Sequence, residues 1–299
     1  MRKNYSLIFG LILLFVFFII IFFGKHLPFV DPELSETNML KTEEEILIPP
    51  YPPMKEFILG SDNNGVDVFS RLVIGAKETF MIVITIVILR YIIAVPLGIV
   101  GFYSRVFRYL VNGINQLLSY MPPIFFIALV IGVPFIIFSD IRTFWIIVVV
   151  ALVEVGRVAE SILQSMDDIS KKAYVEAGIT TGCTKTVLFG KYFWPPLMPH
   201  ILIQFTNDIG RVLFIIAQLG LVGIYITHEF VSQLGGSYLA LNTSNSWPTM
   251  FSTLLHDIFG ARWIPFATVG AIGLSLFTIN LLVSGMQTHF EKKYRKFTG

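Results

Sequence analysis

Charged residues are scarce in this chain, and cysteine is almost absent. Asp, Glu, Lys and Arg make up only 14% of the 299 residues, whereas soluble domains carry roughly a quarter. The single cysteine, Cys183, excludes an intrachain disulfide and a cysteine-rich metal site. A formal net charge of only +2 argues against a large surface for binding nucleic acid.

Familiar catalytic motifs are missing as well. The chain has no Gly-x-x-x-x-Gly-Lys-Ser/Thr loop, so it is not a P-loop ATPase, and it has no His-Glu-x-x-His zinc motif. Its five histidines are scattered, and no facing pair of carboxylates or serine with a base stands out. We therefore expect neither enzymatic activity nor a metal or cofactor on this chain. His228-Glu229 and His256-Asp257 leave a nickel site as the alternative.

Long apolar runs are abundant, and hydrophobic residues make up 55% of the chain. A helix needs about 20 apolar residues to cross the hydrocarbon core of a membrane. The sequence therefore predicts an all-α integral membrane protein with about six transmembrane helices. One run is long enough to hold a tilted or broken helix around Pro122-Pro123. The six runs are 7–23, 80–103, 110–138, 143–163, 199–225 and 263–286.

The first run follows a basic N-terminus, as in a signal peptide, but no small-x-small cleavage site follows it. We therefore expect a retained anchor helix. This divides the chain into residues 1–78, an anchor helix plus an extracytoplasmic segment, and residues 79–299, a transmembrane domain with a cytoplasmic loop at 166–198.

Basic residues gather on one side of the predicted membrane. The acidic residues Asp31, Glu33 and Glu36 and the run Glu43-Glu44-Glu45 fall on the other side, where scattered bases also lie. Because Lys and Arg near span ends favour the cytoplasm, we expect both termini and the loop 166–198 to be cytoplasmic. The basic residues of that side are Arg2, Lys3, Arg105, Arg108, Lys171, Lys172, Lys185, Lys191, Lys292, Lys293, Arg295 and Lys296.

The loop 166–198 combines polar helical segments with a glycine break. Asp167-Asp168-Ile169-Ser170 predicts a helix start, because small polar side chains cap free amides. Gly182 allows a sharp turn between two short helices, although an ordinary helix C-cap is the alternative. Glu176-Ala177-Gly178 precedes this glycine and Pro195 follows it. Residues 176–195 would thus form a rigid polar projection, which we call the knob. Because such a projection has little role in lipid, we expect it to dock onto a soluble partner.

A second motif precedes the second apolar run. Turn-forming residues at 60–65 are followed by Val68, Leu72 and Gly75-Ala76 at helical spacing. The two motifs together resemble the permease subunits of the oligopeptide, dipeptide and nickel class of ABC importers. The similar outside segment is Leu59-Gly60-Ser61-Asp62, Gly65-Val66-Asp67, Ser70-Arg71-Leu72 and Gly75-Ala76-Lys77, and the similar cytoplasmic segment runs from Glu176 to Pro195.

The resemblance covers most of the chain and is to the C-type inner-membrane permease subunit. It implies a type I ABC importer permease fold and four kinds of partner: the lipid bilayer, a second homologous permease, two cytoplasmic ATPases and an extracytoplasmic solute-binding protein. ATP and Mg would be bound by the ATPases. The implied ATPase-coupling residues are Glu176, Ala177, Gly178, Gly182 and Pro195, and those of the extracytoplasmic family segment are Gly60, Asp62, Gly65, Asp67, Ser70, Arg71 and Gly75.

Several departures mark a divergent member of this class. Val66 replaces an arginine, and Gly178 replaces the second alanine of the coupling motif, which weakens helix propensity by up to about 1 kcal/mol. The usual cargo implied by the class is oligopeptides or dipeptides. A nickel or metal-chelate importer and a non-transporting membrane scaffold are the alternatives. A secondary transporter would show internal repeats, and none is convincing here.

Arg90, Glu154, Arg157, Asp208 and Arg211 are ionisable residues inside the apolar runs, where charge is costly and often functional. Glu154 and Arg157 are three residues apart, as are Asp208 and Arg211, so each pair shares one helix face. Arg90 has no partner that the sequence identifies. Either each acid–base pair is a buried structural pair, or these residues face a translocation path and contact the charged termini or backbone of a peptide.

The last outside loop, 227–262, is rich in Gly, Ser and Asn. We expect it to meet the solute-binding protein. Trp247 and Trp263 are interpreted as anchors at the membrane interface, where tryptophan is enriched.

Overall fold

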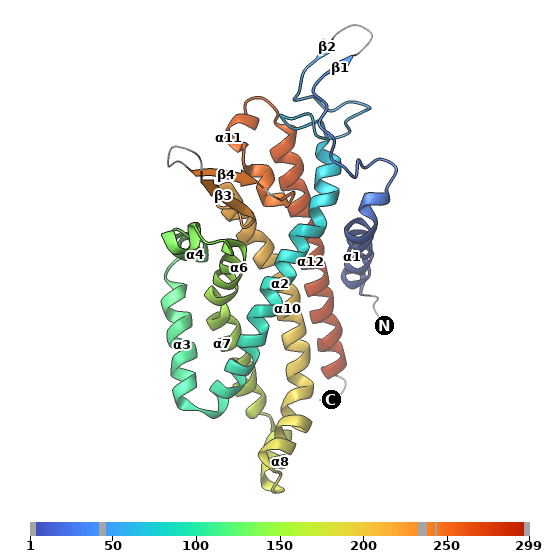
Figure 1. Ribbon diagram of the computed structural model, residues 1–299. Coiled ribbons are helices and arrows are strands. Elements are labelled where there is room, and N and C mark those ends of the chain that lie inside the picture. Colours follow the sequence, from blue (N-terminus) through green and yellow to red (C-terminus); the bar gives the residue numbers. More distant parts are fainter. Residues whose placement is uncertain (1–3, 42–45, 233–237, 243, 296–299) are drawn as a thin grey trace.

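The computed structural model of the protein describes residues 4–41, 46–232, 238–242 and 244–295. Figure 1 shows an elongated helical bundle, with α8 at one end and the β1–β2 hairpin at the other. The elements are α1 Tyr5–Phe23, η1 Gly24–His26, β1 Leu40–Lys41, β2 Ile46–Leu47, α2 Val68–Tyr103, α3 Arg105–Ser119, α4 Pro123–Ile131, α5 Pro134–Ile137, α6 Arg142–Val153, α7 Val155–Ser170, α8 Ala173–Thr180, α9 Lys185–Leu188, η2 Phe189–Phe193, α10 Trp194–Leu221, β3 His228–Ser232, β4 Tyr238–Asn242, η3 Trp247–Phe251, α11 Leu254–Asp257 and α12 Trp263–Arg295.

Four helical segments of the described chain are long and apolar enough to cross a membrane: Tyr5–His26, Val68–Tyr103, Lys185–Leu221 and Trp263–Lys292. A fifth span results if the bent pair Arg105–Leu118 and Pro123–Ile131, which meet at 90°, is counted as one. This break lies at Pro122-Pro123, as the sequence predicts, because proline cannot continue the preceding helix.

The apolar run 143–163 forms two helices rather than one. The chain there forms α6 and α7, with Glu154 between them in a non-helical conformation (φ −107°, ψ 10°). Each half is shorter than a full span, at 12 and 16 residues. Six transmembrane helices therefore remain a prediction for this chain.

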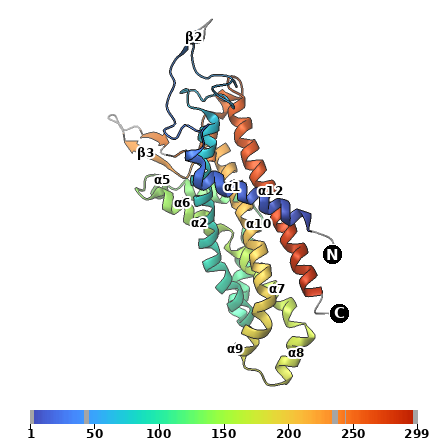
Figure 2. The same cartoon turned by 90° about the vertical axis from the view of Figure 1, so that its right-hand side faces the viewer.

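The helix α1 packs along α12, which it crosses obliquely in Figure 2. The approach is close because glycine faces it: a Cβ on Gly285 would lie 2.6 Å from the Cα of Leu7. The side-chain amide of Asn4 also donates to the carbonyl of Gly285 at 2.7 Å. Close packing at small residues is the usual way that helices associate in lipid, so α1 is an integral part of the bundle.

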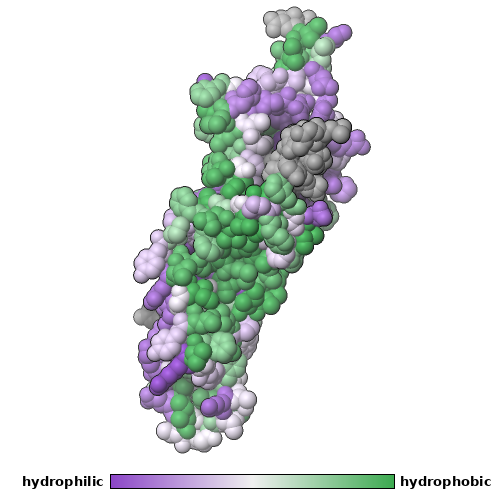
Figure 3. All heavy atoms as spheres, turned by 60° about the vertical axis from the view of Figure 1, so that its left-hand side comes forward, coloured by the Kyte–Doolittle hydropathy of each residue, from purple (hydrophilic) through white to green (hydrophobic). Residues whose placement is uncertain are grey.

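The outer surface carries large apolar side chains around the middle of the bundle. Figure 3 shows a broad apolar area across the middle of one face, with polar residues toward its upper end. On α3 and α4, Leu117, Phe125 and Leu129 are exposed. A surface of this kind fits a hydrocarbon environment rather than water.

Two small antiparallel hairpins complete the fold. The pairs in β1–β2 are Leu40 with Leu47 and Lys41 with Ile46. In β3–β4, His228 pairs with Asn242 and Ser232 pairs with Tyr238. Residues 2, 3, 43–45 and 296, which contributed to the orientation prediction, and residues 233–237 and 243 of the last outside loop lie outside the described residues.

Candidate functional site

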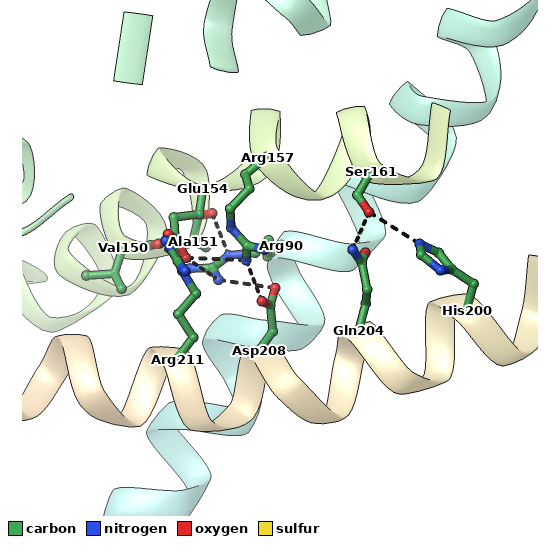
Figure 4. A network of polar contacts seen from close by, with 10 residues as sticks. All are labelled: Arg90, Val150, Ala151, Glu154, Arg157, Ser161, His200, Gln204, Asp208 and Arg211. Atoms are coloured by element: carbon green, nitrogen blue, oxygen red, sulfur yellow. Dashed lines mark hydrogen bonds and ion pairs between the residues drawn. The ribbon is translucent and has the colours of Figure 1, made fainter. Parts of the chain in front are cut away.

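A buried ionic cluster occupies the interior of the bundle, where α2, α7 and α10 meet the end of α6 (Figure 4). Its centre is Arg90, whose side chain has 0% exposure. Arg90 Nη1 donates to Glu154 Oε2 at 3.0 Å and to Asp208 Oδ2 at 3.4 Å. A guanidinium can remain charged at such a depth only if carboxylates and carbonyls replace its lost water.

Arg90 also caps a broken helix. Its Nη2 donates to the carbonyl of Val150 at 2.9 Å, and its Nε donates to the carbonyl of Ala151 at 3.3 Å. These carbonyls belong to the last turn of α6, where a helix end leaves acceptors without intrahelical partners. The cation therefore satisfies the end of α6 and interacts favourably with its dipole. The sequence identifies no partner for Arg90. The structure shows that its partners are the end of α6 and the two acids Glu154 and Asp208.

The other two arginines of the cluster complete it from α7 and α10. Arg157 forms an ion pair with Asp208 and lies 3.6 Å from Glu154, the predicted neighbour three residues away. Arg211 Nε donates to Glu154 Oε1 at 2.6 Å. The predicted pair of Asp208 with Arg211 is wrong, because in the described chain Asp208 binds Arg90 and Arg157, while Arg211 reaches across to Glu154.

A hollow opens beside this cluster. It encloses about 370 Å³ and is lined by Glu154, Arg157 and Arg211 together with residues around the α3–α4 break. The side chains of Arg157 and Arg211 are 29% and 43% exposed, whereas those of Glu154 and Asp208 are 4% and 1% exposed. Each guanidinium that reaches the hollow is thus paired with a buried acid, Arg157 with Asp208 and Arg211 with Glu154. The remaining lining residues are Asn115, Leu118, Tyr120, Met121, Pro122, Pro123 and Val153.

A second polar contact, which sequence reasoning missed, links α7 to α10. Ser161 Oγ lies 3.3 Å from His200 Nε2 and accepts a hydrogen bond from Gln204. Figure 4 shows this group displaced from the ionic cluster along the same two helices. The sequence signal is the spacing of four between His200 and Gln204, which places both on one face of α10.

The predicted coupling segment forms a knob at the α8 end of the bundle (Figures 1 and 2). Gly182 has a φ of +78°, which favours glycine, and the turn there separates α8 from α9 as the sequence predicts. Pro195 lies at the start of α10. The predicted helix start at 167–170 is wrong: these residues end α7, because its apolar face continues through Met166 and Ile169. The new helix begins after Lys172 instead.

The surface of this knob combines an acid with apolar side chains. Glu176 is exposed in the first turn of α8, beside exposed Ala177, and Tyr174 and Ile179 are exposed on the same short helix. Val187 on α9 is exposed as well. Exposed apolar residues around a charged group are typical of surfaces that meet another protein.

Gly178 has a packing role that explains its presence in α8. A Cβ at this position would lie 3.1 Å from Leu188 Cδ1 and 3.1 Å from Tyr192 Cζ. The ring of Tyr192 stacks on that of Tyr174, with centroids 6.4 Å apart. The lower helix propensity of glycine is therefore accompanied by closer packing of α8 against α9 and η2.

The predicted extracytoplasmic segment, residues 59–77, is held by Asp62 and Asp67. Asp62 accepts from the backbone N–H groups of Asn64 and Val66, both at 2.9 Å, and pairs with Arg71 at 2.8 Å. Asp67 caps α2 by accepting from the Ser70 N–H at 2.8 Å. These acids therefore stabilise the start of α2.

The remaining residues of this segment allow close contacts. Gly60 and Gly65 have φ values of +77° and +80°, and a Cβ on them would collide with Trp263 and Thr37. A Cβ on Gly75 would meet the backbone of Asn245. Val66, where the resembled class has arginine, is buried. The segment thus contacts α12 at Trp263 and the loop 227–262 at Asn245.

The histidine-based metal alternative gains no cluster among the side chains that the structure describes, and those of His228 and Glu229 lie outside them. Asp257 accepts from Asn63 Nδ2 at 2.9 Å and from Thr253 Oγ1 at 2.7 Å. In the described ranges, no three His, Cys, Asp or Glu side chains gather closely enough to hold a metal ion.

Comparison with known proteins places these features in a family. Residues 91–296 match the family described as "Binding-protein-dependent transport system inner membrane component". The chain is 25% identical over 296 residues to the oligopeptide transport system permease protein OppC of Bacillus subtilis, covering 99% of this chain and 88% of that protein. It is 24% identical over 299 residues to the dipeptide transport system permease protein DppC of the same organism, covering 99% and 84%.

A more distant relative is a putative peptide transport system permease protein of Brucella suis, 23% identical over 244 residues, covering 82% of this chain and 76% of that protein. The family match and the apolar helices show a multi-pass protein of the bacterial inner membrane. With more than half of its length matched, the chain belongs to the inner-membrane components of binding-protein-dependent transport systems, the permeases of ABC importers.

Proposed function

We propose that this chain forms half of the translocation path of an ATP-driven importer of oligopeptides or dipeptides. The observation that carries the proposal is the knob at 176–195, a helix, a left-handed glycine turn and a second helix that together end the bundle. The chain itself would hydrolyse nothing, since its curated relatives are permease subunits. ATP and Mg would be bound by partner ATPases.

The knob would dock into each partner ATPase through Glu176 and the apolar residues beside it. Tyr174, Ile179 and Val187 would be covered on docking, which gains hydrophobic stabilisation, and Glu176 would meet a basic group. Because Gly178 allows α8 to pack closely on Tyr192, the knob would move as one body with the start of α10. Closure of the ATPases would then rotate α10 and change the opening of the path.

The arrangement requires the knob to be cytoplasmic and the β1–β2 end to face outside. Both termini would be cytoplasmic and the chain would cross the membrane six times, with α6 and α7 together making one span. A second homologous permease, two ATPases and an extracytoplasmic solute-binding protein would complete the complex. The loop 227–262 would meet the binding protein, beside the outside segment to which Asp257 is joined through Asn63.

The cargo is proposed from the relatives, which are named for oligopeptide and dipeptide transport. The hollow beside the ionic cluster would be part of the path. Arg157 and Arg211 are the arginines of the cluster that line this hollow. A nickel or metal-chelate importer is the second candidate.

The test is uptake of labelled dipeptides and oligopeptides by cells that express the chain with its cognate partners. A Glu176→Lys, Gly182→Pro double variant should abolish uptake, because proline cannot adopt the φ of +78° and the acid is reversed. The matched control is Gly270→Ala with Glu291→Lys, since no atom lies within 4 Å of a Cβ at Gly270 and Glu291 is exposed.

Three outcomes separate the parts of this proposal. Loss of uptake in the double variant alone, with normal amounts in the membrane, supports both coupling and cargo. Unchanged uptake in the double variant contradicts the coupling role. If the unaltered complex imports no peptide, the cargo is wrong, and nickel or chelate uptake is measured next.

A further inference from the structure

The ionic cluster carries one more positive than negative charge, and the excess lies on the side of the hollow. Three guanidiniums, of Arg90, Arg157 and Arg211, face two carboxylates, of Glu154 and Asp208. Arg90 is fully buried and uses its donors on acids and carbonyls. The arginines that reach the hollow are Arg157 and Arg211.

The acids of the cluster have no free oxygen to offer a ligand. Glu154 accepts from Arg211 with Oε1 and from Arg90 with Oε2. Asp208 accepts from Arg157 with Oδ1 and from Arg90 with Oδ2. A cationic group entering the hollow would therefore meet guanidiniums and would be repelled.

The arginines, by contrast, keep unused donors. In the described part of the chain, Arg211 makes one hydrogen bond, from Nε to Glu154, so its two terminal nitrogens remain for a ligand. The Nε of Arg157 has no hydrogen-bond partner but is buried, so Arg157 would support a ligand in the hollow through its charge. Planar guanidinium groups bind carboxylates through two parallel hydrogen bonds. The hydrogen bond from Nε to Glu154 fixes the position of the Arg211 guanidinium.

We propose that this hollow is a carboxylate-binding subsite of the translocation path, in which Arg211 binds the carboxylate of the passing peptide and Arg157 supports it. The proposal rests on the proposed function, because it names a group on the cargo of that same path. The hollow of about 370 Å³ admits a terminal residue rather than a whole oligopeptide. The ligand chemistry is a carboxylate, supplied by the peptide C-terminus or by an acidic side chain.

The test uses the complete importer in proteoliposomes with three probes: trialanine, trialanine amide, and an amidated tripeptide with a central glutamate. Arg211→Gln should lower transport of trialanine by about tenfold, the usual scale for a lost charge-assisted hydrogen bond. Transport of trialanine amide should stay unchanged. A fall for the glutamate peptide as well shows that any carboxylate is bound, whereas a fall for trialanine alone assigns the C-terminus.

The control variant is Arg105→Gln, which removes an exposed arginine outside the cluster and should leave all three rates unchanged. The same binding protein delivers each peptide to the variant and to the unaltered importer. Its preference among the three peptides therefore cancels when the transport rate of the variant is divided by that of the unaltered importer. An equal loss for trialanine and its amide overturns the proposal in favour of a structural role. Failure of the Arg211→Gln chain to copurify with the second permease overturns it in favour of a subunit contact. If the unaltered importer moves none of the three peptides, the proposed function itself fails.

Discussion

Arg90 in α2 and Glu154 at the junction of α6 and α7 are 64 residues apart in sequence, yet Nη1 of one lies 3.0 Å from Oε2 of the other. The same guanidinium binds the last carbonyls of α6. The interruption of the helix at Glu154 and the burial of Arg90 are therefore two parts of one arrangement. A break of this kind is tolerated at membrane depth only where the freed carbonyls find donors within the protein.

Replacement of Arg90 should be among the most damaging single changes in the chain. Arg90→Met would leave the carbonyls of Val150 and Ala151 without donors and the acids Glu154 and Asp208 with less positive charge. Breaking a buried ion pair costs about 3–5 kcal/mol. We expect thermal unfolding in detergent to shift markedly downward, measured by the intrinsic fluorescence of the tryptophans, of which Trp247 is buried.

Arg108→Gln supplies the comparison for Arg90→Met. Arg108 donates to both carboxylate oxygens of Asp167, at 2.9 and 2.8 Å, but both side chains are partly exposed. Exposed ion pairs contribute about 0–1 kcal/mol, so this change should shift the transition little. Equal shifts for the two variants would contradict a special role for Arg90.

Asp67→Ala should destabilise the outside segment through loss of the cap on α2. The carboxylate accepts from the N–H of Ser70 at 2.8 Å and from its hydroxyl at 2.5 Å. Loss of an N-cap costs about 1 kcal/mol, up to about 2. Limited proteolysis from the extracytoplasmic side should become faster around residues 60–66, and Asp67→Asn, which keeps a cap acceptor, should restore most of the resistance.

The single cysteine allows a direct test of sidedness. Cys183 is partly exposed in the turn between α8 and α9. A membrane-impermeant maleimide should leave it unlabelled in intact cells and label it in inverted vesicles, because the knob is proposed to be cytoplasmic. Labelling of Cys183 in intact cells would reverse the proposed orientation.

The control for labelling is Lys55→Cys in a Cys183→Ser background. Lys55 is exposed in the segment between β2 and α2. Its thiol should be labelled in intact cells, which shows that the reagent reaches the outer surface. Cys183→Ser alone should take up no label in either preparation.

Local patterns determined several elements of the fold in advance. The Pro122-Pro123 break, the turn at Gly182 and the helix that begins near Val68 all lie where the sequence predicts them. Each depends on the backbone chemistry of a few adjacent residues: proline lacks an N–H, glycine tolerates positive φ, and Asp67 caps its own helix. The five charged residues of the ionic cluster were also identified from sequence, because charge within an apolar run is costly wherever the helices finally pack.

Long-range packing decided the rest. Trp247, interpreted from sequence as a membrane-interface anchor, is buried: its Nε1 donates to the carbonyl of Leu72 at 2.8 Å, and its ring packs edge-on against Phe80. Trp263 donates to the carbonyl of Ser61 at 2.9 Å and packs on Gly60. Whether a tryptophan faces lipid or a neighbouring helix depends on helix rotation, which composition does not encode.

The ionic cluster shows the same division between sequence and tertiary structure. Sequence alone determined that Arg90, Glu154, Arg157, Asp208 and Arg211 lie within long apolar runs, where charge is costly. Only the tertiary structure decided that Asp208 binds Arg90 and Arg157 while Arg211 crosses to Glu154. The physical reason is that a buried charge takes whichever partner the helix packing brings within a few ångströms. That distance is set by contacts between residues far apart in the chain.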